Sequence, residues 1–397
     1  MSITMVGRHM ADIPFSSIRR VFERAARLTA AGTKVINFGI GRPDFDTPGH
    51  IKAAAKKALD EGFVHYTPNS GVPALRQAIA ASIQKYKQVS YGPETEIMVT
   101  AGGQEAIFLS LRALLNPGDE ILVPDPGYTQ LVSAIRLAGG VALPMPLSAG
   151  DNFMPDLEAA GQLIGPQTRG IVVNSPHNPT GAVLDPDQIA EIGRFAEVHG
   201  LVVFSDEAYD RILFPGVDFS SPAALPGMKN RTVIWGSLSK TYAMTGWRVG
   251  YLAAPRELIA AAVRVQQNVL LSACSFAQAG AVAALDGPQE CVDEMVAEFD
   301  RRRKIILDGI AAAPGLTCPT IPRGAFYVFV RHEAADMNSA QLADYILDKA
   351  GVAVIPGTPF GKRGEGFLRI SYATSQAECR EGMARIAEVM DELAADR

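Results

Sequence analysis

The chain has 397 residues, of which 48% are hydrophobic and 20% charged, a balance that predicts a soluble globular protein long enough for two or more domains. Its formal net charge of −5, from 37 basic and 42 acidic residues, excludes a general electrostatic attraction to nucleic acid or to an anionic membrane. We therefore expect neither nucleic acid nor a membrane as a partner.

The first predicted element is a helix over residues 16–31, which has one apolar side. Its arginines form a short stripe that we interpret as a solvated face: Arg19, Arg20, Arg24 and Arg27. A β-type run at 34–38 then enters the turn Gly39-Ile40-Gly41-Arg42-Pro43-Asp44. The glycine spacing does not match a dinucleotide-binding loop. We expect a turn where the backbone comes close to another group.

Helices are predicted at 51–61 and 72–88, with an exposed tyrosine, Tyr66, in the loop between them. From there strands and helices alternate. The strand candidates cover 96–100, 120–124, 141–147, 170–174, 201–205, 232–235 and 249–253. The helix candidates between them cover 105–115, 129–137, 186–199 and 257–269. The strands are continuous apolar runs, which indicates burial on both faces. The predicted fold class is therefore α/β, with a mostly parallel seven-stranded sheet sandwiched by helices.

The pattern changes after residue 287. Residues 266–285 lack charge, but their glutamines and serines favour a buried helix pair over a membrane span. A long helix at 289–312 then precedes short strands at 325–330, 352–355 and 367–371, and helices at 339–350 and 375–393. Ser375 and Glu378 have the spacing of a capping box. We predict a large domain over 48–287, and a smaller α+β domain made of 1–47 plus 288–397.

The cysteines indicate a reducing compartment. Four cysteines without a Cys-x-x-Cys pair do not make a disulfide framework in so long a chain. The N-terminus also lacks the apolar core of a signal peptide. We therefore expect a cytoplasmic protein. The histidines show no metal-ligand spacing, so no metal site is predicted.

Polar groups gather where the predicted strands end. Gly102-Gly103 follows one strand, Asn178-Pro179-Thr180-Gly181 another, and Asp206 with Tyr209 a third. The strand at 232–235 leads into Ser237, Ser239 and Lys240, and Arg248 follows. Each motif alone fits an ordinary turn, cap or loop lysine. Together, at the carboxyl ends of parallel strands, they supply the carboxylate, phenol, lysine and phosphate-binding groups that a pyridoxal phosphate site requires.

These motifs, with Arg369 in Phe367-Leu368-Arg369-Ile370-Ser371, resemble those of the fold-type-I, class I/II aminotransferases. The segment from Gly41 to Pro48 is similar to the prokaryotic aspartate-aminotransferase-like branch. The match runs in order from about residue 14 to residue 394. The resemblance implies pyridoxal 5′-phosphate as the cofactor and a homodimer with shared active sites.

The resemblance also implies roles for individual residues. Lys240 would form the internal aldimine and carry protons, and Asp206 would pair with the pyridine nitrogen. Tyr209 and Asn178 would hydrogen-bond the phenolic oxygen, and Tyr128 would stack on the ring. The phosphate would be held by Arg248, Ser237, Ser239, Gly102, Gly103 and Gln104, with Tyr66 reaching it from the partner subunit. Arg369, with Asn178 and Gly41, would bind the substrate α-carboxylate.

Two positions depart from the family's acidic-substrate members. Gln104 stands where several members of this branch carry a lysine, and no arginine occurs between Arg264 and Arg301. Arg42 could partly compensate, or it could be a surface residue. Specificity for aspartate is therefore supported only weakly.

The leading hypothesis is an enzyme that transfers an amino group between an L-amino acid and a 2-oxoacid. The donor would be aspartate or a neutral or aromatic amino acid, and 2-oxoglutarate the acceptor, in a ping-pong reaction through pyridoxamine phosphate. One alternative is a pyridoxal-phosphate-dependent C–S β-lyase. Another is the sensor domain of a transcription regulator. We disfavour the regulator because only some 15 residues precede the first expected helix and the charge is negative.

Overall fold

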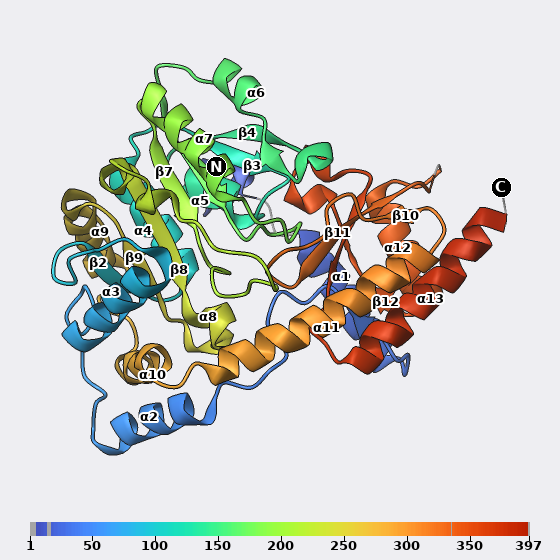
Figure 1. The fold of residues 1–397 in the computed structure, drawn as a ribbon, viewed down its shortest axis with the longest axis horizontal. Helices are drawn as coiled ribbons and strands as arrows, with labels where there is room; N and C mark the ends of the chain where they lie inside the picture. The colour runs from blue at the N-terminus through green and yellow to red at the C-terminus, as the bar shows by residue number, and fades with distance from the viewer. Residues whose placement is uncertain (1–4, 14–16, 335, 396–397) are drawn as a thin grey trace.

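The computed structural model describes residues 5–13, 17–334 and 336–395. It contains a large α/β unit and a smaller α+β unit, and the long helix α11 (Glu290–Ala312) runs from one to the other (Figure 1). The main sheet has the strand order β2-β9-β8-β7-β6-β3-β4-β5. Its strands are β2 (Ile97–Thr100), β3 (Glu120–Asp125), β4 (Val141–Ser148), β5 (Met154–Pro155), β6 (Thr168–Asn174), β7 (Val202–Asp206), β8 (Thr232–Ser237) and β9 (Gly250–Ala253).

The mostly parallel α/β architecture is confirmed, with one additional strand. The five central strands from β8 to β4 run parallel, and β9 is antiparallel to both of its neighbours. All seven predicted strands are present. The eighth, β5, is a two-residue strand antiparallel to the end of β4. So short a segment carries no alternating or continuous apolar pattern, which is why the sequence did not reveal it.

Both faces of the main sheet are apolar and covered by helices. On β6, Ile171 and Val173 pack in a core that includes Ile189 of the helix α7 (Pro186–Val198), whereas Val172 packs on the opposite side with Ile107 of the helix α4 (Gly103–Leu114). Successive side chains of a strand point to opposite faces. Burial of both faces is therefore the physical reason for the continuous apolar runs in the sequence.

The predicted helices lie close to their expected positions, and the structure adds two short helices that were not predicted, α6 and α8. They are α1 (Ser17–Ala30), α2 (Gly49–Asp60), α3 (Pro73–Lys87), α4 (Gly103–Leu114), α5 (Gln130–Leu137), α6 (Leu157–Gln162), α7 (Pro186–Val198), α8 (Leu238–Thr241), α9 (Arg256–Val269), α10 (Ser275–Asp286), α11, α12 (Ser339–Ala350) and α13 (Gln376–Ala395). Ser16, where the first helix was expected to begin, lies outside the described residues.

The uncharged stretch at 266–285 is divided between two helices. It spans the end of α9, a turn and most of α10, and the side chains of Gln266 and Gln278 are fully buried. Both glutamines donate hydrogen bonds to the loop between α2 and α3, at the Asn69 carbonyl and the Thr67 hydroxyl. Among the residues described, no helix combines the length and the apolar character of a membrane span.

The smaller unit is an antiparallel sheet against α11, α12 and α13. Its strand order is β10-β11-β14-β13, with β10 (Leu316–Thr317), β11 (Tyr327–His332), β13 (Ile355–Pro356) and β14 (Phe367–Ser371). The prediction of a single strand at 352–355 is wrong. Its first half, β12 (Val352–Ala353), pairs with β1 (Ile36–Asn37), and only its last residue, Ile355, pairs with β14 as part of β13. An apolar run predicts a strand but not its partner.

Two details of the helix surfaces also differ from expectation. The arginine stripe of α1 is not simply solvated, because Arg24 forms ion pairs with Asp344 and Asp348 of α12 at 3.1 and 2.6 Å. At α13, the Ser375 hydroxyl accepts a hydrogen bond from the Glu378 N–H, as a cap should. The Glu378 carboxylate, however, accepts from the Thr374 hydroxyl, so only half of the capping box forms.

Candidate active site

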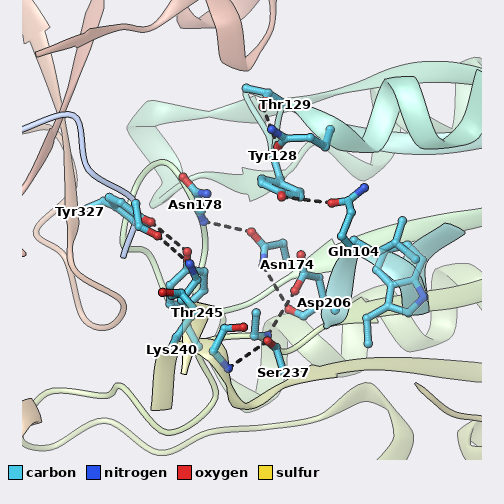
Figure 2. A pocket seen from close by; sticks show the side chains of 18 of the residues that line it. Gln104, Tyr128, Thr129, Asn174, Asn178, Asp206, Ser237, Lys240, Thr245 and Tyr327 are labelled. Carbon is cyan, nitrogen blue, oxygen red and sulfur yellow. Dashed lines mark hydrogen bonds between the residues drawn. The ribbon is translucent and has the colours of Figure 1, made fainter. Parts of the chain in front are cut away.

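A cavity of about 300 Å³ opens where the carboxyl ends of the parallel strands face the smaller unit. Most of the predicted site residues line it: Gly41, Gly103, Gln104, Tyr128, Asn178, Asp206, Tyr209, Ser237, Ser239, Lys240, Arg248 and Arg369. Figure 2 shows how several of these side chains converge. The two exceptions are Gly102, which lies directly behind Arg248, and Tyr66, which is 84% exposed on a loop away from the cavity of its own chain.

One corner of the cavity has the chemistry of an anion site. Gly102 has φ +85°, and a Cβ atom there would overlap the Arg248 guanidinium. Arg248 donates hydrogen bonds to the carbonyl oxygens of Ala101 and Thr245 at 3.3 and 3.0 Å. The helix α4 begins at Gly103, so its free N–H groups and positive dipole end face the same corner. Ser237 and Ser239 add hydroxyls. This combination fits a phosphate.

Lys240 lies on α8, the single helical turn that follows β8. The Ser237 hydroxyl caps this turn by accepting from the Ser239 N–H at 3.2 Å. The Lys240 Nζ atom donates a hydrogen bond of 2.6 Å to the Gly41 carbonyl. Burial, together with the cations of Arg369 and Arg248, lowers the pKa of Lys240 to about 8. At neutral pH roughly a tenth of the amine is therefore unprotonated, which suits a lysine nucleophile.

Asp206 ends β7 and turns its carboxyl group toward the cavity. It accepts a hydrogen bond of 3.2 Å from the Ala208 N–H. Burial raises the pKa of Asp206 to about 6, although the Lys240 cation opposes this change. A buried carboxylate of this kind is stabilised by a cationic partner. A protonated pyridine nitrogen fits that requirement.

Arg369, on β14, is a buried cation without an ion pair among the described residues. It is 4% exposed, and it donates hydrogen bonds to Asn178 Oδ1 at 3.2 Å and to the Gly39 carbonyl at 2.8 Å. Its Nε atom finds no hydrogen-bond partner in the described chain. A buried charge without a counter-ion is costly. The site therefore fits a carboxylate ligand.

The turn at Gly39–Gly41 makes the close approach that was expected of it. A Cβ atom at Gly41 would lie 3.2 Å from the Tyr327 hydroxyl, and one at Gly39 would lie 2.8 Å from Ile355. The carbonyl oxygens of the two glycines accept the hydrogen bonds from Lys240 and Arg369. The turn thus links the lysine to the arginine.

Asn174 organises the strand ends, and the sequence showed it only as the last residue of a strand. Its Oδ1 atom accepts a hydrogen bond of 2.9 Å from the Asn178 N–H, and its Nδ2 atom donates one of 3.1 Å to the Asp206 carbonyl. Figure 2 shows Asn174 between these two residues. The Asn-Ser-Pro sequence that begins with the last residue of β6 could have drawn attention to it, because a buried polar group must find partners.

Other lining residues carry no motif that would reveal them. Tyr327 comes from an apolar strand, and its hydroxyl lies 2.9 Å from that of Tyr209. Ile18 and Phe22 of α1 and Phe360 of the smaller unit form an apolar wall. Such residues are indistinguishable in the sequence from ordinary core residues.

The charges of the residues that line the cavity affect which substrate side chains it can bind. The cations that line it are Lys240, Arg248 and Arg369. Gln104 is neutral and accepts a hydrogen bond of 3.1 Å from the Tyr128 hydroxyl. Arg42, the residue considered as a compensating cation, is exposed and does not line the cavity.

Comparison with known proteins agrees with this arrangement. The sequence model of the family described as "Aminotransferase class I and II" matches residues 33–386. The chain is 41% identical over 381 residues to an aspartate aminotransferase of Pyrococcus abyssi, covering 95% of this chain and 96% of the relative. It is 38% identical over 380 residues to an aromatic-amino-acid aminotransferase 2 of Thermococcus litoralis, with coverage of 95% and 96%. A solved structure of Thermus thermophilus aspartate aminotransferase with maleate superposes with a TM-score of 0.92 at 35% identity, covering 98% of this chain and all of that one.

Proposed function

Because the chain belongs to the class I and II aminotransferases, we propose that its amino donor is an L-amino acid with a neutral or aromatic side chain and that its acceptor is 2-oxoglutarate. The family resemblance noted in the sequence is confirmed. The protein is a pyridoxal-phosphate-dependent enzyme that transfers an amino group between an amino acid and a 2-oxoacid. The two half-reactions would follow a ping-pong order.

The cofactor, when bound, supplies an electron-accepting ring that stabilises negative charge at the substrate Cα. We assign its covalent attachment to the Lys240 Nζ atom, which is the buried amine with the lowered pKa. When it is free, this amine would serve as the base that takes the proton from the substrate Cα and later returns it. Its hydrogen bond to the Gly41 carbonyl holds it within the site.

The other polar residues would hold and orient the cofactor. The Asp206 carboxylate would keep the pyridine nitrogen protonated, and Tyr209 and Asn178 would donate hydrogen bonds to the phenolic oxygen. Tyr128, which lines the cavity, would cover one face of the ring. Arg248, with the backbone of Gly102, Gly103 and Gln104 and the hydroxyls of Ser237 and Ser239, receives the phosphate. The support for these roles is the Gly102 cradle beside Arg248 and the raised pKa of Asp206.

Arg369 would bind the α-carboxylate of the substrate. It is a buried cation whose described contacts include no carboxylate, and its planar fork suits a bidentate pair. Asn178 and the turn at Gly41 lie beside it and complete the site. A fixed carboxylate also fixes the direction of the Cα–H bond toward Lys240.

The observation that carries the donor assignment is the absence of a spare cation among the described lining residues. Lys240, Arg248 and Arg369 are each needed for the cofactor or the α-carboxylate. The neutral residues of the remaining wall include Gln104, Tyr128, Ile18, Phe22 and Phe360. A side-chain carboxylate would lack a partner there, whereas an aromatic ring would find apolar contacts.

We further propose that the enzyme acts as a homodimer in which Tyr66 reaches the phosphate of the partner subunit. The support is its exposure and its surroundings. Tyr66 and Val64 are exposed, and so are Val269, Leu270 and Leu271 at the end of α9. Hydrogen bonds from Gln266 and Gln278 hold the Tyr66 loop beside this segment. Exposed apolar residues that cluster in this way are typical of a subunit interface.

The domain boundaries and the compartment are also proposals. We assign residues 48–287 to a cofactor-binding domain and residues 1–47 plus 288–397 to a smaller domain, supported by the two separate sheets and by the pairing of β1 with β12. Four cysteines that form no disulfide support a cytoplasmic location.

A panel of amino donors assayed against 2-oxoglutarate tests the proposed reaction. We expect phenylalanine, tyrosine and leucine to be used at least as well as aspartate, and the Lys240→Ala variant to lose both transfer and the lysine-linked chromophore. A strong preference for aspartate would overturn the donor assignment. Release of pyruvate and ammonia from cysteine conjugates, without formation of a pyridoxamine form, would instead indicate the C–S β-lyase.

A further inference from the structure

Lys87, the last residue of α3, is a buried lysine that does not line the cavity. It is 3% exposed, and its Nζ atom lies 2.6 Å from a carboxylate oxygen of Glu207 and 2.6 Å from one of Asp210. The rings of Phe219 and Tyr251 lie beside the same atom, which is 5.6 and 5.8 Å from their centres. In the sequence it looks like an ordinary surface lysine at the end of a helix. The proposed reaction assigns it no role.

Lys87 joins the two carboxylates as a cation. Burial lowers the pKa of Lys87, but the carboxylates of Asp210 and Glu207 outweigh that effect and hold the pKa well above its usual value. A buried ammonium without partners would be costly, whereas one that contacts two carboxylates is compensated. The three side chains therefore form one buried cluster of two anions and one cation, with a formal charge of −1.

The Glu207 carboxylate is also held from a second side, by hydroxyl groups. Its Oε1 atom accepts hydrogen bonds from Ser205 at 2.8 Å and from Ser221 at 2.6 Å, while its Oε2 atom accepts one from Lys87 at 2.6 Å. Because two hydroxyls share Oε1, the loss of either one leaves this oxygen with a partner. The link between Glu207 and Asp210, in contrast, depends on Lys87.

The two carboxylates alternate with cavity-facing residues in the turn at 206–210, which follows β7. Asp206, Ala208 and Tyr209 line the cavity, whereas Glu207 and Asp210 do not. The Asp210 N–H donates a hydrogen bond of 3.2 Å to the Glu207 carbonyl within this turn. A group that holds residues 207 and 210 on the outer side therefore also fixes the directions of residues 206 and 209 on the inner side.

We propose that Lys87 is a positioning residue: it clamps the turn at 206–210 through Glu207 and Asp210, and so orients Asp206 and Tyr209 toward the cofactor. A buried ion pair contributes little net stability compared with apolar residues of similar size. Its effect here is geometric, because a displacement of about 1 Å in a catalytic group can reduce the rate by about 100-fold. The inference rests on the proposed function, which places the cofactor ring beside Asp206 and Tyr209.

The double variant Lys87→Met/Glu207→Gln tests this clamp. It removes the link to Asp210 but keeps the formal charge of the cluster at −1, since one cation and one carboxylate are lost together. The glutamine oxygen can still accept the hydrogen bonds from Ser205 and Ser221. Lys87→Met alone is a poorer test, because it leaves two buried carboxylates without a cation and should destabilise the whole protein.

Hydrogen exchange of the cofactor-free protein, followed by mass spectrometry, reports on the turn itself. In the double variant we expect the amides of residues 207–212 to exchange about 10-fold faster or more, because their hydrogen bonds open locally. Peptides from β3, elsewhere in the main sheet, should exchange at the wild-type rate. Unchanged exchange of the turn would overturn the clamp.

Cofactor binding gives a second readout. The Kd for pyridoxal phosphate should rise about 10-fold in the double variant, because the contacts to the ring are weakened. Inorganic phosphate occupies only the corner at Arg248, so its inhibition constant in competition with the cofactor should not change. A parallel loss of phosphate affinity would overturn the clamp, because it would indicate that the whole site is disordered.

In the loaded double variant, kcat should fall by about 10- to 100-fold while KM changes by less than about threefold. The reason for this split is that the substrate carboxylate is bound by Arg369 on the smaller unit, which the clamp does not contact. A rise in KM with an unchanged kcat would overturn the positioning role.

Ile83→Ala is the matched control. Ile83 is fully buried on the same helix, one turn before Lys87, and it packs in the apolar cluster that contains Tyr251. Its truncation should destabilise α3 while Lys87 and both carboxylates stay in place. We expect wild-type exchange of the turn, a wild-type Kd and a wild-type kcat. If Ile83→Ala changes these quantities as the double variant does, loss of helix stability explains both, and the clamp is overturned.

Failure of the proposed function would look different. It would show as a wild-type protein that forms no lysine-linked chromophore with pyridoxal phosphate, whereas hydrogen exchange of the cofactor-free turn does not depend on the cofactor. A normal wild-type chromophore together with a wild-type Kd and kcat in the double variant would overturn the clamp alone.

Discussion

Asn174 and Asp206 end neighbouring parallel strands as register partners, and the Asn174 side chain donates a hydrogen bond of 3.1 Å to the Asp206 carbonyl oxygen. The same side chain accepts a hydrogen bond of 2.9 Å from the Asn178 N–H. One amide therefore sets the spacing between the proposed partners of the pyridine nitrogen and of the phenolic oxygen.

Replacing Asn174 should reduce turnover more than stability. Asn174→Asp keeps an acceptor for Asn178 and loses the donor to Asp206, and we expect kcat to fall about 10-fold because a small displacement of catalytic groups has a large effect on rate. Asn174→Leu should reduce kcat further. Ser205→Ala is the control, since Ser205 is equally buried on β7 but its hydroxyl donates to Glu207. A wild-type kcat in Asn174→Leu would contradict the positioning role.

The Asp206→Asn variant should be inactive yet more stable without cofactor. Burial raises the pKa of Asp206 from 3.8 to about 6, so the carboxyl group contributes stability below pH 4 that is lost as the pH rises through 6. Asparagine avoids this loss. Between pH 4 and pH 7 the cofactor-free variant should therefore gain about 2 to 3 kcal/mol relative to wild type.

Urea denaturation of both cofactor-free proteins at pH 4, 5.5 and 7 measures this difference, and turnover of the loaded variant should be lower by at least about 100-fold. If the stability difference between the two proteins does not depend on pH, burial does not raise the pKa of the Asp206 carboxyl group.

Gly102→Ala should weaken cofactor binding through Arg248. Alanine adds strain at φ +85° and places a methyl group against the guanidinium that faces the phosphate corner. Gly118→Ala is a matched control, because Gly118 has φ +86° and no atom lies within 4 Å of the added Cβ. Both variants should lose about 1 to 2 kcal/mol of stability from the left-handed backbone. Only Gly102→Ala should raise the Kd for pyridoxal phosphate, by about 10-fold or more, in an absorbance titration.

Gln104→Lys should shift the donor preference toward aspartate. A lysine would place a cation beside Tyr128 on a wall that is otherwise neutral, and a charge-assisted hydrogen bond contributes about 1.5 to 3 kcal/mol, or roughly 10- to 100-fold in relative kcat/KM. Gln104→Met removes the hydrogen bond from Tyr128 without adding charge. If the ratio of aspartate to phenylalanine kcat/KM changes equally in both variants, charge at this position does not set specificity.

Mixed dimers should show whether Tyr66 serves the active site of its own subunit or that of the partner subunit. Lys240→Ala and Tyr66→Ala each impair every site of their own homodimers. If Tyr66 serves the partner subunit, random mixing of the two variants creates one intact site in each mixed dimer, or about a quarter of all sites. Activity at limiting pyridoxal phosphate should then reappear on mixing after mild dissociation. The formation of mixed dimers would be verified by their mass. If activity does not reappear in them, Tyr66 either serves the site of its own subunit or serves no active site.

Much of the architecture follows from local patterns. Continuous apolar runs such as that of β6 predicted buried parallel strands, and parallel strands bring their carboxyl ends to one edge of the sheet. For that reason Asn178, Asp206 and Lys240, which follow three different strands, could be expected in one site. The split of residues 352–355 between two sheets could not be predicted, because pairing partners are chosen by long-range packing.

The sequence by itself determined the fold class, the family and the polar groups of the site, because these are encoded by periodicity and by residue types at strand ends. Only the tertiary structure decided which apolar residues complete that site. Tyr327, Ile18 and Phe22 come from distant segments whose patterns indicate only a core strand and an amphipathic helix. Their role arises from the packing of the smaller unit and α1 over the strand ends, and such contacts between remote segments leave no local trace in the chain.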